Sequence, residues 1–264
     1  MRFALNHITV PKMGLEEFFA LAKGLDMTEV EIRNDLPNVV DSWKAKDVKT
    51  LAAKMGLTLL TINALYPFNQ WSGELEAKAI KMADFAAESG AKALVMCPLN
   101  EGIEIAYNDL VAALRKIKPI LDQRGILGYV EPLGFPVSSL RHKSLAIQAI
   151  KDISANDRNE TYKLVHDTFH HHLAGESDFF PEWTGLVHIS GVSDQKIAVD
   201  DMQDAHRVLI DSSDRLGNLA QMRSLKAAGY QGRFSFEPFA KAIHDLPNPE
   251  ATLRESMEYM RAAL

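Results

Sequence analysis

Strand-like and helix-like segments alternate along the whole chain, and this alternation restricts the folds that it can adopt. Runs of apolar, β-branched and aromatic residues have the length of strands, and each is followed by an amphipathic segment or a long connection. The expected strands are Phe3–Ile8, Glu29–Ile32, Leu57–Asn63, Ala93–Cys97, Ile126–Glu131, Tyr162–Asp167, Leu186–Ser190 and Arg233–Glu237. The expected helices are Gly14–Gly24, Ser42–Met55, Gly73–Ser89, Asn108–Arg124, Ser144–Ile153, His170–Glu176, Leu216–Ala228 and Pro249–Leu264. The pair Asn156-Asp157 is expected to form a turn after the fifth helix.

Such alternation is typical of parallel strands that are joined by helical crossovers. Eight repeats in 264 residues fit a closed (β/α)8 barrel, the TIM-barrel fold of the α/β class, better than an open sheet. No linker rich in glycine, serine or proline divides the chain, so we expect residues 1–264 to form a single domain. The longest connection, Gly191–Arg215, is rich in Asp, Ser and Gln, and its length predicts an active-site loop over the barrel mouth.

The composition is that of an ordinary globular protein, with 47% hydrophobic and 24% charged residues. A net charge of -6 argues against nucleic acid or an anionic membrane surface as a partner. No apolar run approaches the roughly 20 residues that a membrane helix needs, and the first residues lack the pattern of a signal peptide. Cys97 is the only cysteine, so no intrachain disulfide can form, and we expect a cytoplasmic protein.

Four residues that can bind divalent metal ions stand at the ends of the last four expected strands. They are Glu131, Asp167, His188 and Glu237. Active sites of (β/α)8 barrels lie at the carboxyl ends of the strands, so these side chains are expected to line one side of the mouth. Carboxylates that are buried together repel one another, and a divalent cation removes that repulsion. Carboxylates and a histidine form a suitable site for zinc, manganese or cobalt.

Longer motifs surround these residues and extend over nearly the whole chain. They are Val-Glu-Ile-Arg (Val30–Arg33), Ile-Asn-Ala-Leu (Ile62–Leu65), Gly-Ala-Lys-Ala-Leu-Val-Met-Cys-Pro-Leu (Gly90–Leu99), Glu-Pro-Leu-Gly-Phe-Pro (Glu131–Pro136) and Asp-Thr-Phe-His-His-His (Asp167–His172). Together they resemble the xylose-isomerase-like barrel superfamily of sugar isomerases, epimerases and AP endonucleases. Within it, the resemblance is greatest to the inosose isomerases of myo-inositol catabolism. Its most specific element is Asp-Thr-Phe-His after a strand, in order with the other three site residues.

The resemblance implies that the four strand-end residues are the metal ligands: Glu131, Asp167, His188 and Glu237. It also implies that His170 and Arg207 bind oxygen atoms of the substrate. Two segments depart from the family pattern, since Ser190-Gly191 stands in place of an aspartate pair and Leu209-Ile210-Asp211 in place of Trp-Pro-Gly. Both segments fall in the loop over the mouth, so they bear on the identity of the substrate more than on the metal site.

The chemistry expected of this site is proton abstraction next to a carbonyl group. A keto-sugar or inosose forms an enediolate when the neighbouring C–H proton leaves, and a metal ion that chelates the two oxygens stabilises the negative charge. We assign the acid and base roles to Glu131 and Glu237, which come from strands five and eight and are expected to flank the substrate. Nitrogen and oxygen ligands together allow zinc, manganese, cobalt or magnesium.

The leading prediction is a metal-dependent isomerase of a small keto-sugar or keto-cyclitol such as an inosose. A ketose 3-epimerase would use the same residues with a different substrate pose, and an inosose dehydratase would need only an acid at the leaving hydroxyl group. A sugar-binding barrel without activity is the alternative that is not an enzyme. Such barrels often associate, so a homo-oligomer is possible, but no interface signature gives a number of subunits.

Several other polar residues near the strand ends have roles that the pattern leaves open. Glu31 and Arg33 close the second strand and are candidates for an ion pair at the rim or for substrate contact. Strand alternation points His166 outward into the helix layer. We expect His171 to be solvated and Cys97, which follows three apolar residues, to be a buried core thiol.

Overall fold

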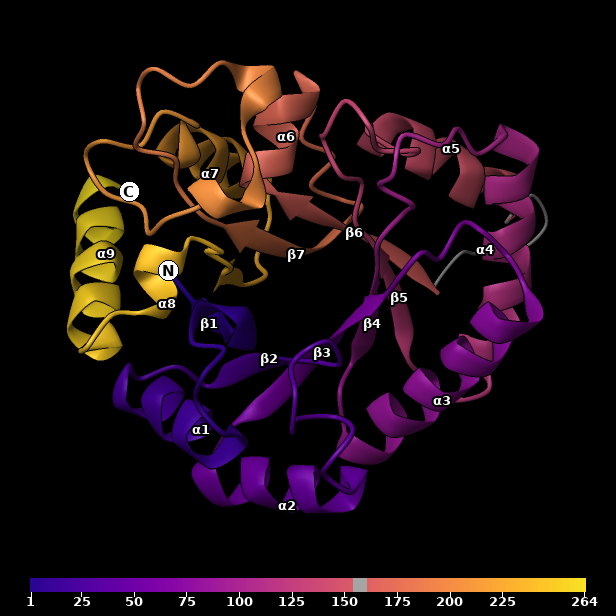
Figure 1. Ribbon diagram of the computed structural model, residues 1–264, viewed down its shortest axis with the longest axis horizontal. Helices are drawn as coiled ribbons and strands as arrows, with labels where there is room; N and C mark the ends of the chain where they lie inside the picture. The colour runs from indigo at the N-terminus through magenta and orange to yellow at the C-terminus, as the bar shows by residue number, and fades with distance from the viewer. Residues whose placement is uncertain (154–160) are drawn as a thin grey trace.

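In the computed structural model, which describes residues 1–153 and 161–264, parallel strands form a closed barrel surrounded by helices (Figure 1). Each strand pairs with the next in chain order, and the last pairs with the first, for example Leu5 with Phe236. The predicted (β/α)8 fold is therefore confirmed. The turn expected at Asn156-Asp157 lies outside the described residues.

Strands and helices alternate as the sequence indicates. The strands are β1 (Phe3–Asn6), β2 (Glu29–Arg33), β3 (Thr58–Leu65), β4 (Ala93–Met96), β5 (Leu127–Val130), β6 (Tyr162–Asp167), β7 (Thr184–Ile189) and β8 (Phe234–Phe236). The helices are α1 (Leu15–Gly24), α2 (Ala45–Met55), α3 (Gly73–Ser89), α4 (Tyr107–Asp122), α5 (Lys143–Ile153), α6 (Thr168–Ala174), α7 (Asn218–Ala227), α8 (Lys241–His244) and α9 (Pro249–Ala263). Within the described ranges, no helix is both long enough and apolar enough to cross a membrane.

Capping residues explain where two of these helices begin and end. The Ser72 hydroxyl accepts a hydrogen bond from the Leu75 amide at 3.1 Å at the start of α3, and Gly90 ends the helix in the left-handed conformation (φ 82°). Helix α6 begins two residues earlier than expected. Its first turn is capped by the side chain of Asp167, which accepts hydrogen bonds from the amides of Phe169 and His170 at 2.7 and 3.1 Å.

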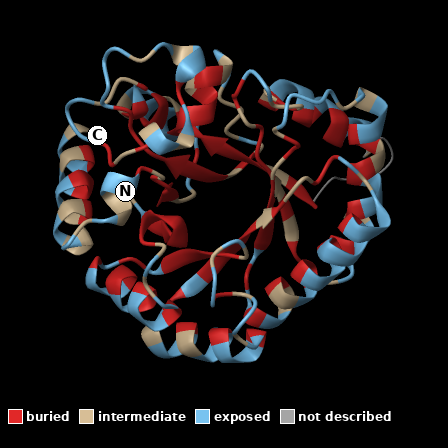
Figure 2. Cartoon of the chain, viewed as in Figure 1, coloured by how far each residue is buried: buried red, intermediate tan, exposed pale blue. Residues whose placement is uncertain are grey.

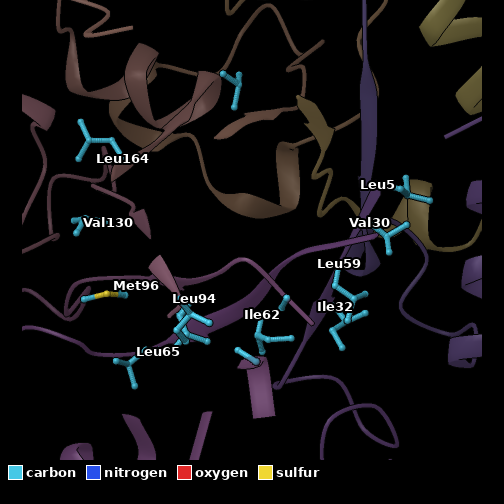
Figure 3. Close-up of a cluster of buried hydrophobic side chains, with 14 of the residues drawn as sticks. Leu5, Val30, Ile32, Leu59, Ile62, Leu65, Leu94, Met96, Val130 and Leu164 are labelled. Atoms are coloured by element: carbon cyan, nitrogen blue, oxygen red, sulfur yellow. The ribbon is translucent and has the colours of Figure 1, made fainter. Parts of the chain in front are cut away.

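Alternation along the strands separates two faces of the barrel wall. Outward side chains form a continuous apolar layer against the helices, and Figure 3 shows members of it, including Leu5, Val30, Ile62 and Leu94. The helices bury the faces that they turn toward the barrel and expose the opposite faces (Figure 2). Because successive residues point to opposite faces of a strand, the intervening positions point into the barrel. These inward positions hold the polar side chains that the sequence places near the strand ends.

The long connection between β7 and α7 folds back onto the barrel. Gly191 and Val208 exchange backbone hydrogen bonds of 2.8 Å, which ties the middle of the loop to the end of β7. The neighbouring Arg207 is only 1% exposed, although it belongs to a loop. Closure of the loop thus places a guanidinium group inside the barrel mouth.

Candidate functional site

The four strand-end residues come together at the carboxyl ends of strands β5 to β8. Each offers one ligand atom, and these atoms all lie within 4.8 Å of one another: Glu131, Asp167, His188 and Glu237. All four side chains are buried. They converge because each occupies an inward position at or just past the end of a parallel strand, and the register sets Asp167 opposite His188.

His188 is the cationic centre of the cluster. Its Nδ1 lies 2.8 Å from Glu131 Oε1 and 3.2 Å from Glu237 Oε2, while its Nε2 lies 3.1 Å from Glu31 Oε2. Burial alone would lower the pKa of His188, but the negative charges of Glu237, Glu31 and Glu131 outweigh burial and raise it well above the usual value. The protonated ring therefore holds the carboxylates together, with Nδ1 facing the four-residue cluster.

Glu31 is a further part of this network, for which the sequence left a rim ion pair and substrate contact as alternatives. It makes no rim ion pair with Arg33. Instead it is fully buried and accepts hydrogen bonds from Thr61 at 2.5 Å, from Asn63 at 3.0 Å and from Ser235. Burial favours a higher pKa, but His188 and these donors lower the pKa of Glu31 to about 2. The available signal was strand alternation, which sets Glu31 on the same inward face as Arg33.

Arg207 lies against two of the three carboxylates of the cluster. Its Nη2 donates to Asp167 Oδ2 at 2.6 Å and to Glu237 Oε2 at 3.0 Å, and its Nε donates to Ser190 at 2.9 Å. The guanidinium carbon also lies 5.1 Å from the ring centre of Phe169 and 4.6 Å from that of Phe239. Contacts with two rings and three oxygens fix the plane of the guanidinium group.

Glu237 accepts more hydrogen bonds from side chains than the other carboxylates of the cluster. Its Oε1 accepts from Asn6 Nδ2 and from Arg33 Nη1, each at 3.1 Å, in addition to the bond from Arg207 to Oε2. Burial favours a higher pKa, but His188, Arg207 and Arg33 lower the pKa of Glu237 to about 2. Glu237 is thus ionised at neutral pH and held in one orientation.

A cavity of about 160 Å³ opens directly above the cluster. Its lining includes Glu131, Glu237, Arg207 and His170, so the two residues expected to bind substrate face the same space as the two expected to move protons. The Nδ1 atom of His170 is buried and has no hydrogen-bond partner among the described residues. An unsatisfied buried ring nitrogen at a cavity wall is available to a bound molecule.

Three further predictions concern residues close to the cluster, and one of them is confirmed. His166 points outward, with Nε2 3.0 Å from Gln221 Oε1 on α7. His171 is not solvated but buried, and its Nδ1 lies 2.6 Å from the ammonium group of Lys143. Cys97 is not a core thiol but is half-buried, lines the cavity and donates to Glu131 Oε2 at 3.4 Å. Burial and the Glu131 charge raise the pKa of this thiol.

The ligand atoms of the cluster suit a divalent cation. Three carboxylates and one imidazole nitrogen form a mixed oxygen and nitrogen set, which zinc, manganese, cobalt and magnesium accept. The negative charges are buried at the base of a cavity, where their ion-pair partners among the described residues are the protonated His188, Arg33 and Arg207. A cation at this point would take over that compensation.

Comparison with known proteins agrees with the barrel fold. Residues 19–263 match the family model described as a xylose isomerase-like TIM barrel. A xylose isomerase domain-containing protein from Salmonella typhimurium LT2 is 36% identical, with a TM-score of 0.90 over 99% of this chain and 96% of that chain. No curated protein is similar enough in sequence to count as a match.

Two more distant crystal structures share the fold. The IolI protein with a bound zinc atom has a TM-score of 0.83 at 20% identity, covering 99% of this chain and 97% of that chain. The 3-keto-D-glucoside 4-epimerase YcjR from E. coli has a TM-score of 0.72 at 17% identity, covering 99% of both chains.

Proposed function

Because the chain belongs to the xylose isomerase-like TIM-barrel family, we propose that it is a metal-dependent isomerase of a keto-sugar or keto-cyclitol, such as an inosose, with residues 1–264 as one catalytic domain. The observation that carries the proposal is the convergence of three carboxylates and one histidine within 4.8 Å beneath a cavity. The family includes isomerases and epimerases, which supports this class of reaction.

In this proposal Glu131, Asp167, His188 and Glu237 hold the metal ion. Nδ1 of His188 is the ligand nitrogen, because Nε2 faces Glu31. Asp167 would offer Oδ2, which also accepts a hydrogen bond from Arg207, because Oδ1 caps helix α6. When bound, the ion would supply positive charge to the carbonyl and hydroxyl oxygens of the substrate, on which negative charge develops during proton removal.

Glu131 is the residue that we assign as the base. It removes the proton from the carbon next to the carbonyl group, and the C–H electron pair passes into the enediolate. The isomerisation is complete when the same proton is delivered to the former carbonyl carbon and the hydroxyl proton passes from the neighbouring oxygen to the former carbonyl oxygen. Glu237 is held by three donors from Asn6, Arg33 and Arg207, whereas Glu131 contacts His188 and the Cys97 thiol. The smaller number of donors leaves Glu131 more free to take up a proton.

His170 and Arg207 position the substrate. His170 lines the cavity, where its ring can bond a hydroxyl group. Arg207 is fixed between the rings of Phe169 and Phe239 and can donate to a substrate oxygen without first becoming ordered. Leu133 and Phe135 add an apolar wall that limits the access of water.

A ketose 3-epimerase is the second candidate. Glu131 and Glu237 follow β5 and β8 and both line the cavity, and in this alternative they would act as two bases on two faces of one carbon. Epimerisation requires that Glu237 carry a proton before it returns one to the carbon, and the donors around Glu237 disfavour its protonated form. The products of the reaction separate the two functions.

The test is proton exchange in deuterated water. Metal-stripped protein is reloaded with manganese or zinc and supplied with scyllo-inosose or a panel of ketohexoses, and exchange and products are followed by NMR. We expect metal-dependent deuterium uptake that falls about 10²–10⁴-fold in Glu131→Gln and is lowered in Glu237→Gln. The exposed Glu182→Gln is the matched control.

Each product identifies one reaction. A shifted carbonyl group indicates an isomerase, an inverted carbon an epimerase, and loss of water an inosose dehydratase. Metal binding without exchange in any substrate would overturn the proposal in favour of a sugar-binding barrel or another substrate class.

A further inference from the structure

A second depression adjoins the cavity above the cluster, on the side of strands β2, β3 and β4. It has a volume of about 460 Å³ and shares Arg33, Ala64 and Cys97 with that cavity. We propose that this depression, here called the annex, binds a second hydroxylated ring, so that the substrate is a glycosylated keto-sugar or keto-cyclitol rather than a free one. The inference rests on the proposed function and names its substrate class.

The sizes of the two spaces favour one continuous site. Pockets that bind small molecules usually enclose about 300–1,000 Å³. The cavity above the cluster, at about 160 Å³, is smaller than this range, whereas the annex adds about 460 Å³. A ring that reacts at Glu131 therefore fills the inner space and leaves the larger outer space to another part of the same molecule.

The shared residues show how the two spaces connect. Arg33 reaches both, because its Nη1 donates to Glu237 at 3.1 Å and its Nε and Nη2 donate to Asp35 at 2.8 and 2.6 Å. Ala64 lines both spaces and has only a methyl side chain, which adds little bulk between them. A substrate that extends over Ala64 enters the annex without displacing the arginine.

The lining of the annex suits a neutral ring with many hydroxyl groups. Asn34, Asp35, Tyr66 and Lys78 supply both donors and acceptors, and Tyr66 adds an aromatic ring. The buried Oδ1 of Asn34 has no hydrogen-bond partner among the described residues. A lining that offers both hydrogen-bond donors and acceptors matches hydroxyl groups, each of which can both donate and accept a hydrogen bond.

The charges of the annex disfavour a phosphate or carboxylate group in the same place. Arg33 is already neutralised by Asp35 and Glu237. Lys78, whose Nζ donates to the Tyr66 carbonyl at 2.9 Å, is the cation of the annex lining that makes no ion pair with a carboxylate of the described residues. An anionic group would also lie near the Asp35 carboxylate, which would repel it.

The test compares substrates that differ only in the second ring. Fructose is one probe, and the glucosyl-fructoses turanose, maltulose, leucrose and isomaltulose are the others, since they attach glucose to four different oxygens of the same ketose. Metal-loaded protein is assayed for deuterium exchange into each sugar. Binding to the same protein is measured in parallel by calorimetry, which does not depend on turnover.

We expect at least one linkage isomer to bind about tenfold more tightly than fructose and to exchange with a correspondingly higher kcat/KM. Lys78→Gln should remove most of this advantage. It should leave the affinity and the kcat/KM for fructose unchanged, because the Nζ donor is lost only from the annex. The matched control is Lys81→Gln, which replaces another exposed lysine on α3. It should change the affinity and the kcat/KM for neither kind of sugar.

Two results overturn the inference alone. One is that every glucosyl-fructose binds no better than fructose, and the other is that the advantage is the same in Lys78→Gln. Binding that depends on Lys78 without exchange in any sugar supports the annex and contradicts the proposed reaction. Absence of both binding and exchange for all five sugars contradicts both.

Discussion

At the scale of single residues, both ring nitrogens of His188 are engaged. Nδ1 faces the carboxylate cluster, and Nε2 lies 3.1 Å from Glu31, which is itself held by Thr61, Asn63 and Ser235. A histidine that binds a metal ion through one nitrogen is oriented by the hydrogen bond of the other. Glu31 is therefore a positioning residue, which acts on the metal site through His188.

Replacing Glu31 tests this role directly. Glu31→Gln should weaken the affinity for manganese or zinc by about 10–100-fold, because the neutral amide no longer fixes the tautomer of His188. The measurement is competition with a coloured chelator. Glu29→Gln, two residues earlier on β2, removes a buried partner of Arg233 and Lys92 and should lower stability without changing metal affinity. Equal affinities in wild type and Glu31→Gln would show that His188 is oriented by other contacts.

At the scale of elements, Glu176 joins helices α5 and α6. Its two oxygens accept from the amides of Lys143 and Ser144, each at 3.0 Å, and so cap the first turn of α5. The ammonium group of Lys143 is buried, 3.2 Å from Glu176 and 2.6 Å from Nδ1 of His171 on α6. This joint holds the helix that carries His170.

Removal of this joint should cost stability. Glu176→Ala should lower the free energy of unfolding by about 2–4 kcal/mol, because α5 loses its cap and the buried Lys143 loses its counter-charge. The measurement is urea denaturation of the metal-free protein. The exposed Glu182→Ala should change stability by less than about 0.5 kcal/mol.

The contribution of Glu176 to the free energy of unfolding should also depend on pH. Burial alone would raise the pKa of Glu176, but Lys143 lowers it below the usual value of 4.5. A carboxyl group whose pKa is lowered on folding stabilises the protein above its unfolded pKa and loses that contribution as the pH falls. The difference between wild type and Glu176→Ala should therefore shrink at a pH below about 4.5. A difference that stays constant down to pH 3 would contradict the role of the charge.

The sequence predicts most elements of this fold because apolar runs and helix caps are local signals. Strand β6 has the predicted bounds, Tyr162–Asp167, since a strand-length run around Leu164 and Val165 ends at a charged residue. Helix α8, Lys241–His244, was not expected, because four residues are too few to show helical periodicity. The burial of His171 could not be predicted either, since its partner Lys143 lies 28 positions earlier in the chain.

The residues of the site also divide into those with a local sequence signal and those that depend on contacts between distant segments. Glu131 and Glu237 each end an apolar run, so their position at the mouth follows from the fold class. Glu31 lies inside its strand rather than at the end, and its partners come from β3, β7 and β8. Contacts of that kind appear only when the barrel closes.

At the scale of the whole molecule, closure of the barrel brings charges from distant parts of the chain together. Glu237 contacts Asn6 and Arg33 across more than 200 positions of sequence. The metal-free cluster therefore gathers several buried charges whose mutual compensation depends on the complete fold. A ligand that binds only the folded chain at this point stabilises the entire barrel.

Metal addition should accordingly raise the melting temperature. At one hundred times the Kd, binding adds about 2.7 kcal/mol, which corresponds to about 5–10 °C for a domain of this size. Differential scanning calorimetry with manganese, zinc, cobalt and magnesium measures the shift, and a chelator should reverse it. Asp167→Asn removes one charged ligand and should show a smaller shift. No shift with any of the four ions, or an equal shift in Asp167→Asn, would argue against a metal centre in this cluster.

The division of each strand into inward and outward positions has a consequence for how such a protein can change. Inward Asn63 and Cys97 line the cavity, while their outward neighbours Ile62 and Met96 pack against the helices. Chemistry and folding are thus encoded by two interleaved sets of positions. A library that varies only the inward set would sample new substrate preferences while every member keeps the apolar layer that makes it fold.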